Sequence, residues 1–218
     1  MDTSKFIDSL ATDLQPVSPL PAPVMRAALM SLTALVLVTG MISFLGGPRA
    51  DWLSVLQNPI FMSGDILMLV AGFLSAVAAF TLAVPDTKIR KPVIALLCSA
   101  TVIWVVICLY AAASLTAQGV QAEITDIGKS AACFKALIFM SALPLAVSFY
   151  MALRAAPVWR GWTGYALTLS MASFGAFGMR FFCPSDSYAH LLLWHFLPVV
   201  ILSVLGGVLG RIILRFKL

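Results

Sequence analysis

Residues 183–198 read CPSDSYAHLLLWHFLP and form a short polar turn between two long apolar segments. The stretch brings together a cysteine, an acid, both histidines of the chain and a tryptophan. Polar groups are costly at the depth of a membrane's hydrocarbon, and those that persist there usually pair with one another or serve a function. The stretch therefore predicts two membrane helices, with the first candidate site at the turn that joins them.

The composition on either side of this turn is that of an integral membrane protein. Of the 218 residues, 61% are hydrophobic and 11% are charged, whereas soluble domains carry about 25% charged residues. An apolar stretch of roughly 20 residues spans a bilayer as a helix. We expect an all-α, polytopic fold with six transmembrane helices, at residues 27–46, 62–84, 93–117, 132–153, 162–182 and 189–213.

The basic residues set the expected orientation of these helices. Six spans put both termini on one side, where ten of the 14 Lys and Arg then lie. Only Arg49, Lys129, Lys135 and Arg180 lie on the other side. Because cytoplasmic loops carry the excess of positive charge, both termini are expected in the cytoplasm and the 183–188 turn outside. The expected division is a cytoplasmic arm at residues 1–26 and a six-helix transmembrane domain at residues 27–218.

The net charge of +5 does not indicate a nucleic-acid partner, because the basic residues lie in short clusters at segment ends. The sequence contains no phosphate-binding loop, no HExxH zinc motif and no nucleophile elbow. It contains no CxxC pair either. We therefore expect a protein that is not an enzyme, carries no cofactor and does not bind nucleic acid directly, with the lipid bilayer as its surroundings.

The N-terminal arm has an amphipathic segment followed by a proline-rich spacer. Its apolar residues recur at roughly helical spacing beside acids, and prolines at positions 16, 19, 21 and 23 forbid a continuing helix. Two interpretations remain open, a frayed tail on a rigid spacer and a segment whose apolar stripe binds a groove on a partner. The candidate partner-binding residues are Phe6, Ile7, Leu10, Asp13 and Leu14.

Two of the four cysteines lie near the outer boundary of the membrane under this topology. Cys133 opens the fourth expected span and Cys183 closes the fifth, so the two lie at the same depth. Outside a bacterial inner membrane the environment is oxidising, and two neighbouring thiols there can form a disulfide or bind a soft metal. Cys98 and Cys108, inside the third span, are expected to be small buried apolar side chains.

Other polar side chains fall at the same depth as these two thiols. Asp65 is expected to pair with Lys135 or Arg180, since ionisable groups inside a membrane usually face inward and pair. An alternative is that Arg180 lies beside the second thiol, three residues later, and lowers its pKa. Asp186 or Ser185 is expected to cap the sixth helix. The candidate supporting cluster is Asp65, Lys135, Arg180, Asp186, His190, Trp194 and His195.

The two histidines belong to the sixth expected helix. His190 and Trp194 share one face of an α-helix, whereas His195 lies about 140° around it from His190, at about 100° per residue. We therefore expect the two histidines to be poor co-ligands for one metal. A mixed site of Cys133, Cys183 and His190 has ligand types that metals accept, but its spacing matches no standard zinc signature. Transient binding of a soft metal is the interpretation that this spacing leaves.

In these residues the chain resembles the NrsF-like family of bacterial six-span membrane anti-sigma factors. The resemblance covers essentially the whole length, with an arm like LATDLQPVSPLPAP, a cysteine at the start of the fourth span and a signature like CPxDSxxHxxxWHxxP. It implies a multi-pass protein of the bacterial inner membrane and a cytoplasmic partner, an extracytoplasmic-function (ECF) sigma factor that is held inactive. The signature residues are Arg180, Cys183, Pro184, His190, Trp194, His195 and Pro198.

The resemblance also implies a sensing role for two outward cysteines that respond to heavy metals or oxidants, at Cys133 and Cys183 here. We therefore expect a stress-responsive regulator of transcription, in which modification of this pair changes the packing of the last three spans and releases the sigma factor. Two alternatives remain open. One is a membrane thiol oxidoreductase coupled to quinone, against which the missing CxxC pair argues. The other is a small-solute transporter, for which Pro144 and Pro198 are weak evidence.

Overall fold

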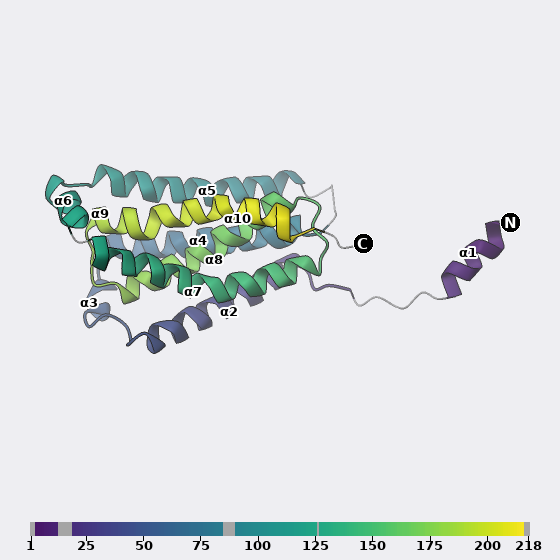
Figure 1. Cartoon of the computed structure of the whole chain (residues 1–218), viewed down its shortest axis with the longest axis horizontal. Coiled ribbons are helices and arrows are strands. Elements are labelled where there is room, and N and C mark those ends of the chain that lie inside the picture. Colours follow the sequence, from purple (N-terminus) through teal and green to yellow (C-terminus); the bar gives the residue numbers. More distant parts are fainter. Residues whose placement is uncertain (1–2, 13–18, 85–89, 126, 216–218) are drawn as a thin grey trace.

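The computed structural model of the chain is a bundle of long helices that run side by side (Figure 1). It describes residues 3–12, 19–84, 90–125 and 127–215, and these ranges contain no strand. The helices are α1 (Thr3–Thr12), α2 (Pro23–Phe44), α3 (Trp52–Val55), α4 (Pro59–Leu82), α5 (Arg90–Ala113), α6 (Ala117–Thr125), α7 (Ile127–Leu153), α8 (Arg160–Phe182), α9 (Tyr188–His190), the π-helix η1 (Leu191–Phe196) and α10 (Leu197–Ile213).

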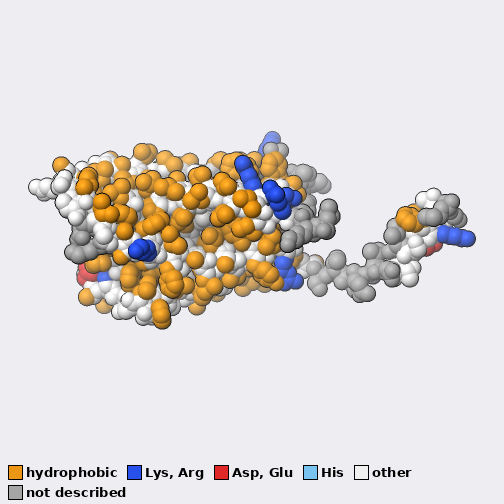
Figure 2. Space-filling view, in the orientation of Figure 1, with side chains coloured by type: hydrophobic (Ala, Val, Ile, Leu, Met, Phe, Trp, Pro, Cys, Tyr) orange, Lys and Arg blue, Asp and Glu red, His pale blue; other side chains and the backbone are white. Residues whose placement is uncertain are grey.

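Five helical segments of the described chain are long and apolar enough to cross a membrane. They are Pro23–Phe44, Pro59–Leu82, Lys91–Ala113, Ala131–Leu153 and Tyr188–Ile213. Hydrophobic side chains accordingly cover the flank of the bundle (Figure 2). The expected all-helical fold is confirmed, and its five long apolar helices are compatible with a multi-pass membrane protein. The remaining expected span, at residues 162–182, is a helix of similar length, α8, which lies inside the same bundle.

α8 occupies the centre of the bundle, where it packs against α10, α4, α7 and α2. Its buried residues run from Thr163 to Arg180. Glycines allow the closest approach to α10, because a Cβ on Gly164 would collide with the carbonyl oxygen of Gly206. Such small-residue contacts are typical of helix packing inside membranes.

Hydroxyl groups of α8 also hold its neighbours. Ser170 Oγ donates to the carbonyl oxygen of Gly72 in α4 at 2.7 Å, and Ser173 Oγ accepts from Trp104 Nε1 in α5 at 2.7 Å. A helix surrounded by protein can carry these two serines because both find a partner there. This explains why α8 is less apolar than the helices around it.

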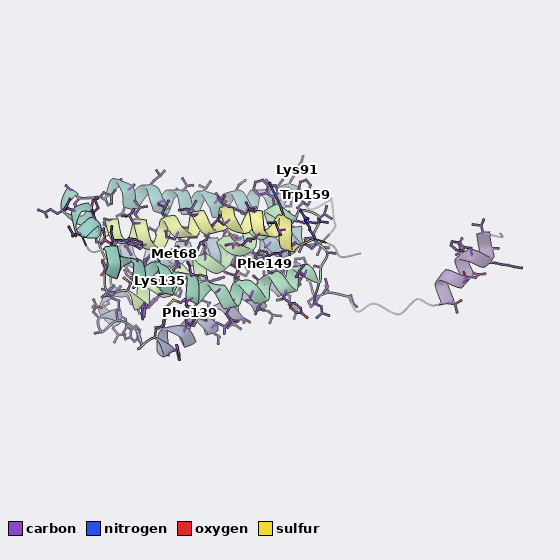
Figure 3. All side chains as sticks on the ribbon, in the orientation of Figure 1. Met68, Lys91, Lys135, Phe139, Phe149 and Trp159 are labelled. Atoms are coloured by element: carbon purple, nitrogen blue, oxygen red, sulfur yellow. The ribbon has the colours of Figure 1, made fainter. Side chains whose placement is uncertain are left out.

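The two ends of the bundle differ. The chain enters α2 and leaves α10 at one end, whereas α3, α6 and α9 lie at the opposite end, which we call the distal end (Figure 1). Lys91 on α5 and Trp159 lie near the end that the termini share (Figure 3). The first residues of α7, the 183–188 turn and the start of η1 meet at the distal end.

Outward-facing positions on α5 and α7 correct two expectations. Cys98 is exposed and Cys108 is partly exposed, so the expectation that both are buried is wrong. The reason is that α5 lies at the edge of the bundle and packs mainly on α4. Lys135 is exposed on the outside of α7 (Figure 3), so it does not belong to the polar cluster in which it was expected.

Candidate functional site

Four side chains that can bind a metal converge at the distal end. Cys133 lies near the start of α7, and Cys183 directly follows α8. His190 is the last residue of α9, and His195 lies within η1. Their sulfur and ring nitrogen atoms all lie within 4.8 Å of one another. The Sγ atoms of the two cysteines are 3.4 Å apart, and Cys183 Sγ is 3.3 Å from His190 Nε2. The structure therefore brings into contact two thiols for which the sequence indicated only a common depth.

A π-helical turn explains how His190 and His195 meet. Residues Leu191–Phe196 form a π-helix. Its hydrogen bonds join residues five apart, so His190 and His195 lie on the same face. The two imidazole centroids are 5.2 Å apart. Pro198 follows the turn; in an α-helix it would leave the carbonyl four residues earlier without a donor and its ring would collide with that carbonyl. The expectation that the two histidines are poor co-ligands is wrong, because it assumed α-helical geometry through this turn.

Three of the four side chains in the cluster are buried, and Cys133 is partly exposed. The exposed fractions are 2% for Cys183, 4% for His190 and 0% for His195. Neither ring nitrogen of His195 has a hydrogen-bond partner among the described residues. Leaving such a group unpaired in the interior costs about 1–3 kcal/mol. The ring nitrogens of His195, one of which lies near the thiols, are therefore available to bind a ligand.

Glu123 on α6 is a site residue that sequence reasoning missed. One of its carboxylate oxygens, Oε2, lies 3.0 Å from His190 Nδ1 and accepts a hydrogen bond from Trp194 Nε1 at 3.0 Å. Glu123 is only 8% exposed. A carboxylate beside Nδ1 orients the imidazole with Nε2 next to Cys183, where Nε2 can donate to the thiolate or, once it has lost its proton, act as a metal ligand. The only sequence signal was an acidic residue in the loop that precedes Cys133 by ten positions.

The environment of Cys183 favours its thiolate. The hydrogen bond with Cys133 is the largest effect that lowers the pKa of Cys183, His190 adds to it, and burial opposes both. Arg180 had been an alternative source of this effect. Its guanidinium instead pairs with Asp65, so the groups in contact with the thiolate are the second thiol and the imidazoles.

Asp65 and Arg180 form a buried ion pair next to the cluster. Arg180 Nε lies 3.3 Å from Asp65 Oδ1, and the guanidinium stacks 3.6 Å from the centroid of the Phe61 ring. Of the two partners expected for Asp65, the structure therefore has Arg180. The aromatic face and the carboxylate together compensate for part of the cost of burying this charge.

Arg49, in the loop between α2 and α3, holds the turn that carries Cys183. Its two terminal nitrogens each donate at 2.8 Å to one oxygen of Asp186, and Nη1 also donates to the carbonyl oxygen of Cys183 at 3.1 Å. Asp51 accepts from Arg49 Nε at 2.6 Å. The bond to Asp186 contributes most to raising the pKa of Arg49, while Arg49 lowers the pKa of Asp51.

The helix cap expected at Asp186 or Ser185 is wrong. The N-cap position of α9 is Ser187, whose side chain makes no capping hydrogen bond. Asp186 is instead engaged with Arg49, because a bidentate bond to a guanidinium is stronger than a bond to a backbone amide.

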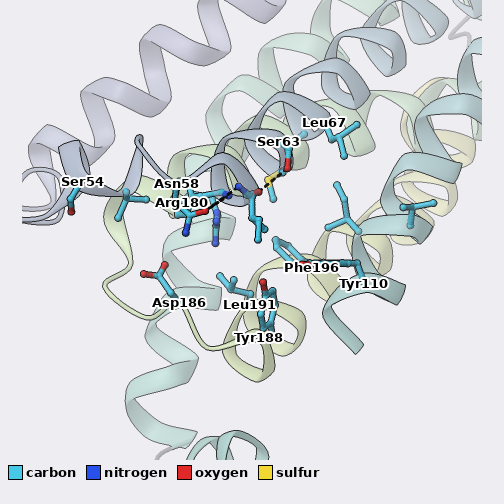
Figure 4. A pocket seen from close by; sticks show the side chains of 17 residues that line it. Ser54, Asn58, Ser63, Leu67, Tyr110, Arg180, Asp186, Tyr188, Leu191 and Phe196 are labelled. Carbon is cyan, nitrogen blue, oxygen red and sulfur yellow. Dashed lines mark hydrogen bonds between the residues drawn. The ribbon is translucent and has the colours of Figure 1, made fainter. Parts of the chain in front are cut away.

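A separate pocket of about 580 Å³ opens beside the ion pair (Figure 4). Arg180, Asp186 and Tyr188 lie around it, and the rest of the lining comes from α3, α4, α5 and η1 and is mostly apolar. Neither Cys133 nor Cys183 lines this pocket. The four-ligand cluster is therefore separate from this pocket.

The N-terminal helix α1 stands apart from the bundle in Figure 1. Phe6 and Ile7 are 47% and 59% exposed. The side chain of Leu10 lies outside the described part of the chain, as do Asp13 and Leu14 entirely. The apolar stripe expected on this arm is therefore visible only in its first half.

Comparison with known proteins adds the last observations. Residues 10–216 match the family NrsF, described as negative regulator of sigma F. A curated relative, the anti-sigma-F factor NrsF of Caulobacter vibrioides (strain NA1000 / CB15N), is 28% identical over 227 aligned residues, which cover 99% of this chain and 100% of the relative. No solved structure matches the chain.

Proposed function

The chain belongs to the NrsF family of negative regulators of sigma F, and from this premise we propose that it is a membrane anti-sigma factor that holds an ECF sigma factor inactive. Its action is regulatory rather than catalytic. The sigma factor is released when the Cys133–Cys183 pair reacts with a heavy metal or an oxidant. The observation that carries the proposal is the contact between these two thiols, 3.4 Å apart, at the end of the bundle opposite the termini.

In this proposal the protein crosses the bacterial inner membrane six times, with α8 as the fifth span. A sixth crossing is supported by the length of α8 and by its place among five apolar helices. The exit of both termini at one end of the bundle supports an even number of crossings. The excess of Lys and Arg at that end supports a cytoplasmic location for it. The thiol pair then faces the periplasm.

Residues 1–26 are the proposed sigma-binding arm, separate from the transmembrane domain at residues 27–218. The exposed apolar side chains of Phe6 and Ile7 support this role, since an apolar stripe outside a bilayer tends to occupy a groove on a partner. The prolines at positions 16, 19, 21 and 23 argue from the sequence for a spacer that gives the arm reach. The resting state buries a sigma surface against this stripe.

Modification of the thiols has to change the affinity for sigma, which requires two bundle states that bind it differently. The thiols connect the start of α7 to the end of α8, and the partner histidines belong to the segment that leads into α10. A bond or a metal between them therefore acts on the packing of three helices. These helices reach the end from which the arm emerges.

The test is co-purification of the cognate sigma factor with the full chain from bacterial membranes, before and after addition of cadmium or a disulfide-forming oxidant. We expect capture by the untreated protein and release on treatment. Cys133→Ser and Cys183→Ser should retain capture but not release, whereas Cys98→Ser should behave as wild type. Full release from the two serine variants would remove the thiol pair from the proposal, and full capture without residues 1–26 would remove the arm.

A further inference from the structure

We propose that Cys133, Cys183, His190 and His195 form a four-ligand site for one divalent d10 cation, Zn²⁺ or the softer Cd²⁺, with Glu123 orienting His190. The inference rests on the proposed function, because it names the ligand of the same thiol pair. It goes beyond a bridge between two sulfurs, since it makes both histidines ligands and gives a buried carboxylate a positioning role.

The distances in the cluster suit one tetrahedral ion. Zinc binds thiolate sulfur at about 2.3 Å and imidazole nitrogen at about 2.0–2.1 Å, so ligand atoms in a tetrahedral site lie about 3.3–3.8 Å apart. The two sulfurs are 3.4 Å apart, and Cys183 Sγ lies 3.3 Å from His190 Nε2. All four ligand atoms lie within 4.8 Å of one another. Only small side-chain movements separate this arrangement from a coordination shell.

The charge and the type of the donors select the cation. Two sulfurs and two imidazoles favour tetrahedral, borderline or soft ions over the hard cations that prefer oxygen. In the bound state both sulfurs are thiolates, and their two negative charges neutralise the divalent ion. The protons that the sulfurs and imidazoles still carry are released on binding. The low exposure of Cys183, His190 and His195 limits the access of water that would compete as a ligand.

His195 is the residue that a thiol pair alone leaves unexplained. A disulfide between Cys133 and Cys183 would need no imidazole, yet His195 is fully buried and neither of its ring nitrogens has a hydrogen-bond partner in the described chain. The π-turn that places it there is itself a costly and unusual helix geometry. A cation bound between the thiols would satisfy one of these nitrogens.

Glu123 supplies the support that metal-bound histidines usually have. Its carboxylate accepts a hydrogen bond from Nδ1 of His190, so Nε2, the nitrogen beside Cys183, is the one that loses its proton when the imidazole binds a cation. The Trp194 indole donates to the same carboxylate oxygen and holds it in place. Carboxylate partners of this kind orient metal-binding imidazoles, and their loss typically lowers metal affinity about 10–100-fold.

The experiment uses the purified full chain in detergent, reduced with a phosphine and stripped of metal by a chelator. Co²⁺ serves as the probe, because tetrahedral thiolate–imidazole coordination gives intense visible absorption that hydrated Co²⁺ lacks. Competition by Zn²⁺ and Cd²⁺ then ranks their affinities. We expect one equivalent of Co²⁺ for the wild type and for the matched control Cys98→Ser/Cys108→Ser. Glu123→Gln should bind about 10–100-fold more weakly, and His195→Gln more weakly than Glu123→Gln.

Three results would overturn the inference: no Co²⁺ absorption by the wild type with its thiols shown to be reduced, an unchanged affinity and spectrum in His195→Gln, or an unchanged affinity in Glu123→Gln. Thermal unfolding of each metal-free variant identifies those that fail to fold. If His195→Gln fails, the change in spectrum of His195→Asn decides the same question.

Sigma capture measured on the same preparations separates this inference from the proposed function. Oxidant-dependent release of sigma by a protein that does not bind Co²⁺ would overturn the metal site alone. A tetrahedral Co²⁺ spectrum from a protein that captures no sigma factor would support the site and overturn the proposed function.

Discussion

Replacing glycine by alanine is expected to have opposite effects on stability at two positions. Gly164 lies in the close contact between α8 and α10, whereas Gly40 lies outside it. At Gly164 an added Cβ would collide with the carbonyl oxygen of Gly206 and would lie 2.7 Å from the Cα of Gly210. Both obstacles are backbone atoms, so the helices themselves have to separate. At Gly40, on the exposed side of α2, an added Cβ has no atom within 4 Å.

The magnitudes follow from these two environments. Overpacking a well-packed contact costs about 1–3 kcal/mol, and two backbone collisions place Gly164→Ala at the upper end. The gain in helix propensity from Gly to Ala is about 1 kcal/mol. We therefore expect Gly164→Ala to lower the free energy of unfolding by about 2 kcal/mol and Gly40→Ala to raise it by about 0.5–1 kcal/mol.

The assay is equilibrium unfolding in mixed micelles, with loss of helical circular dichroism followed against the mole fraction of sodium dodecyl sulfate. The two variants differ from wild type by one methyl group each, so they control for each other. Gly164→Ala as stable as Gly40→Ala would refute the argument that these helices meet at backbone distance.

Three further predictions concern the distal end. Asp65→Asn leaves the buried Arg180 guanidinium without a charged partner and should lower the free energy of unfolding by about 3–5 kcal/mol in the same assay, whereas an unchanged transition would mean that the stacked aromatic ring suffices. Arg49→Gln frees the 183–188 turn and should speed modification of Cys183 by a small thiosulfonate, followed by peptide mass mapping; a wild-type rate would show that the turn is held by other contacts. Because the pKa of Cys183 is lowered, its thiolate persists below the usual thiol range. Its modification rate should therefore fall much less between about pH 8 and about pH 6 than the roughly 75-fold expected for a thiol of pKa about 8.5, and a fall of that full size would contradict the lowered pKa.

The fold was largely predictable because a single property, apolar length, determines it. Each of the six expected segments lies on a long helix of the structure. The segment at 162–182 is less apolar than the others because α8 is surrounded by protein. Its glycines allow close helix packing, and its hydroxyl groups form hydrogen bonds with neighbouring helices. The exposure of Cys98 could not be predicted, since it depends on which face of an edge helix meets its neighbour.

The site was predictable in depth but not in geometry. The ends of two apolar segments placed Cys133 and Cys183 at one level, but their contact depends on the lateral order of the helices. Glu123 could not be predicted as a site residue because it lies 67 positions from His190 in the sequence and belongs to no recognisable motif. The proximity of His195 to His190 could not be predicted for a different reason: the helix changes from α-helical to π-helical hydrogen bonding between them.

The π-helix η1 also determines which side of α10 faces the interior of the bundle. In an uninterrupted α-helix Gly206 would lie about 160° around the axis from His190, but the residue taken up by the π-turn reduces this to about 60°. The imidazole and the glycine contact can thus both face the bundle interior. Deleting one residue between the two histidines would leave the length of the span almost unchanged, yet it would turn one of these two groups toward the lipid. The chemistry at one end of the helix and its packing at the other therefore share a single rotational setting, which a one-residue change of length would destroy.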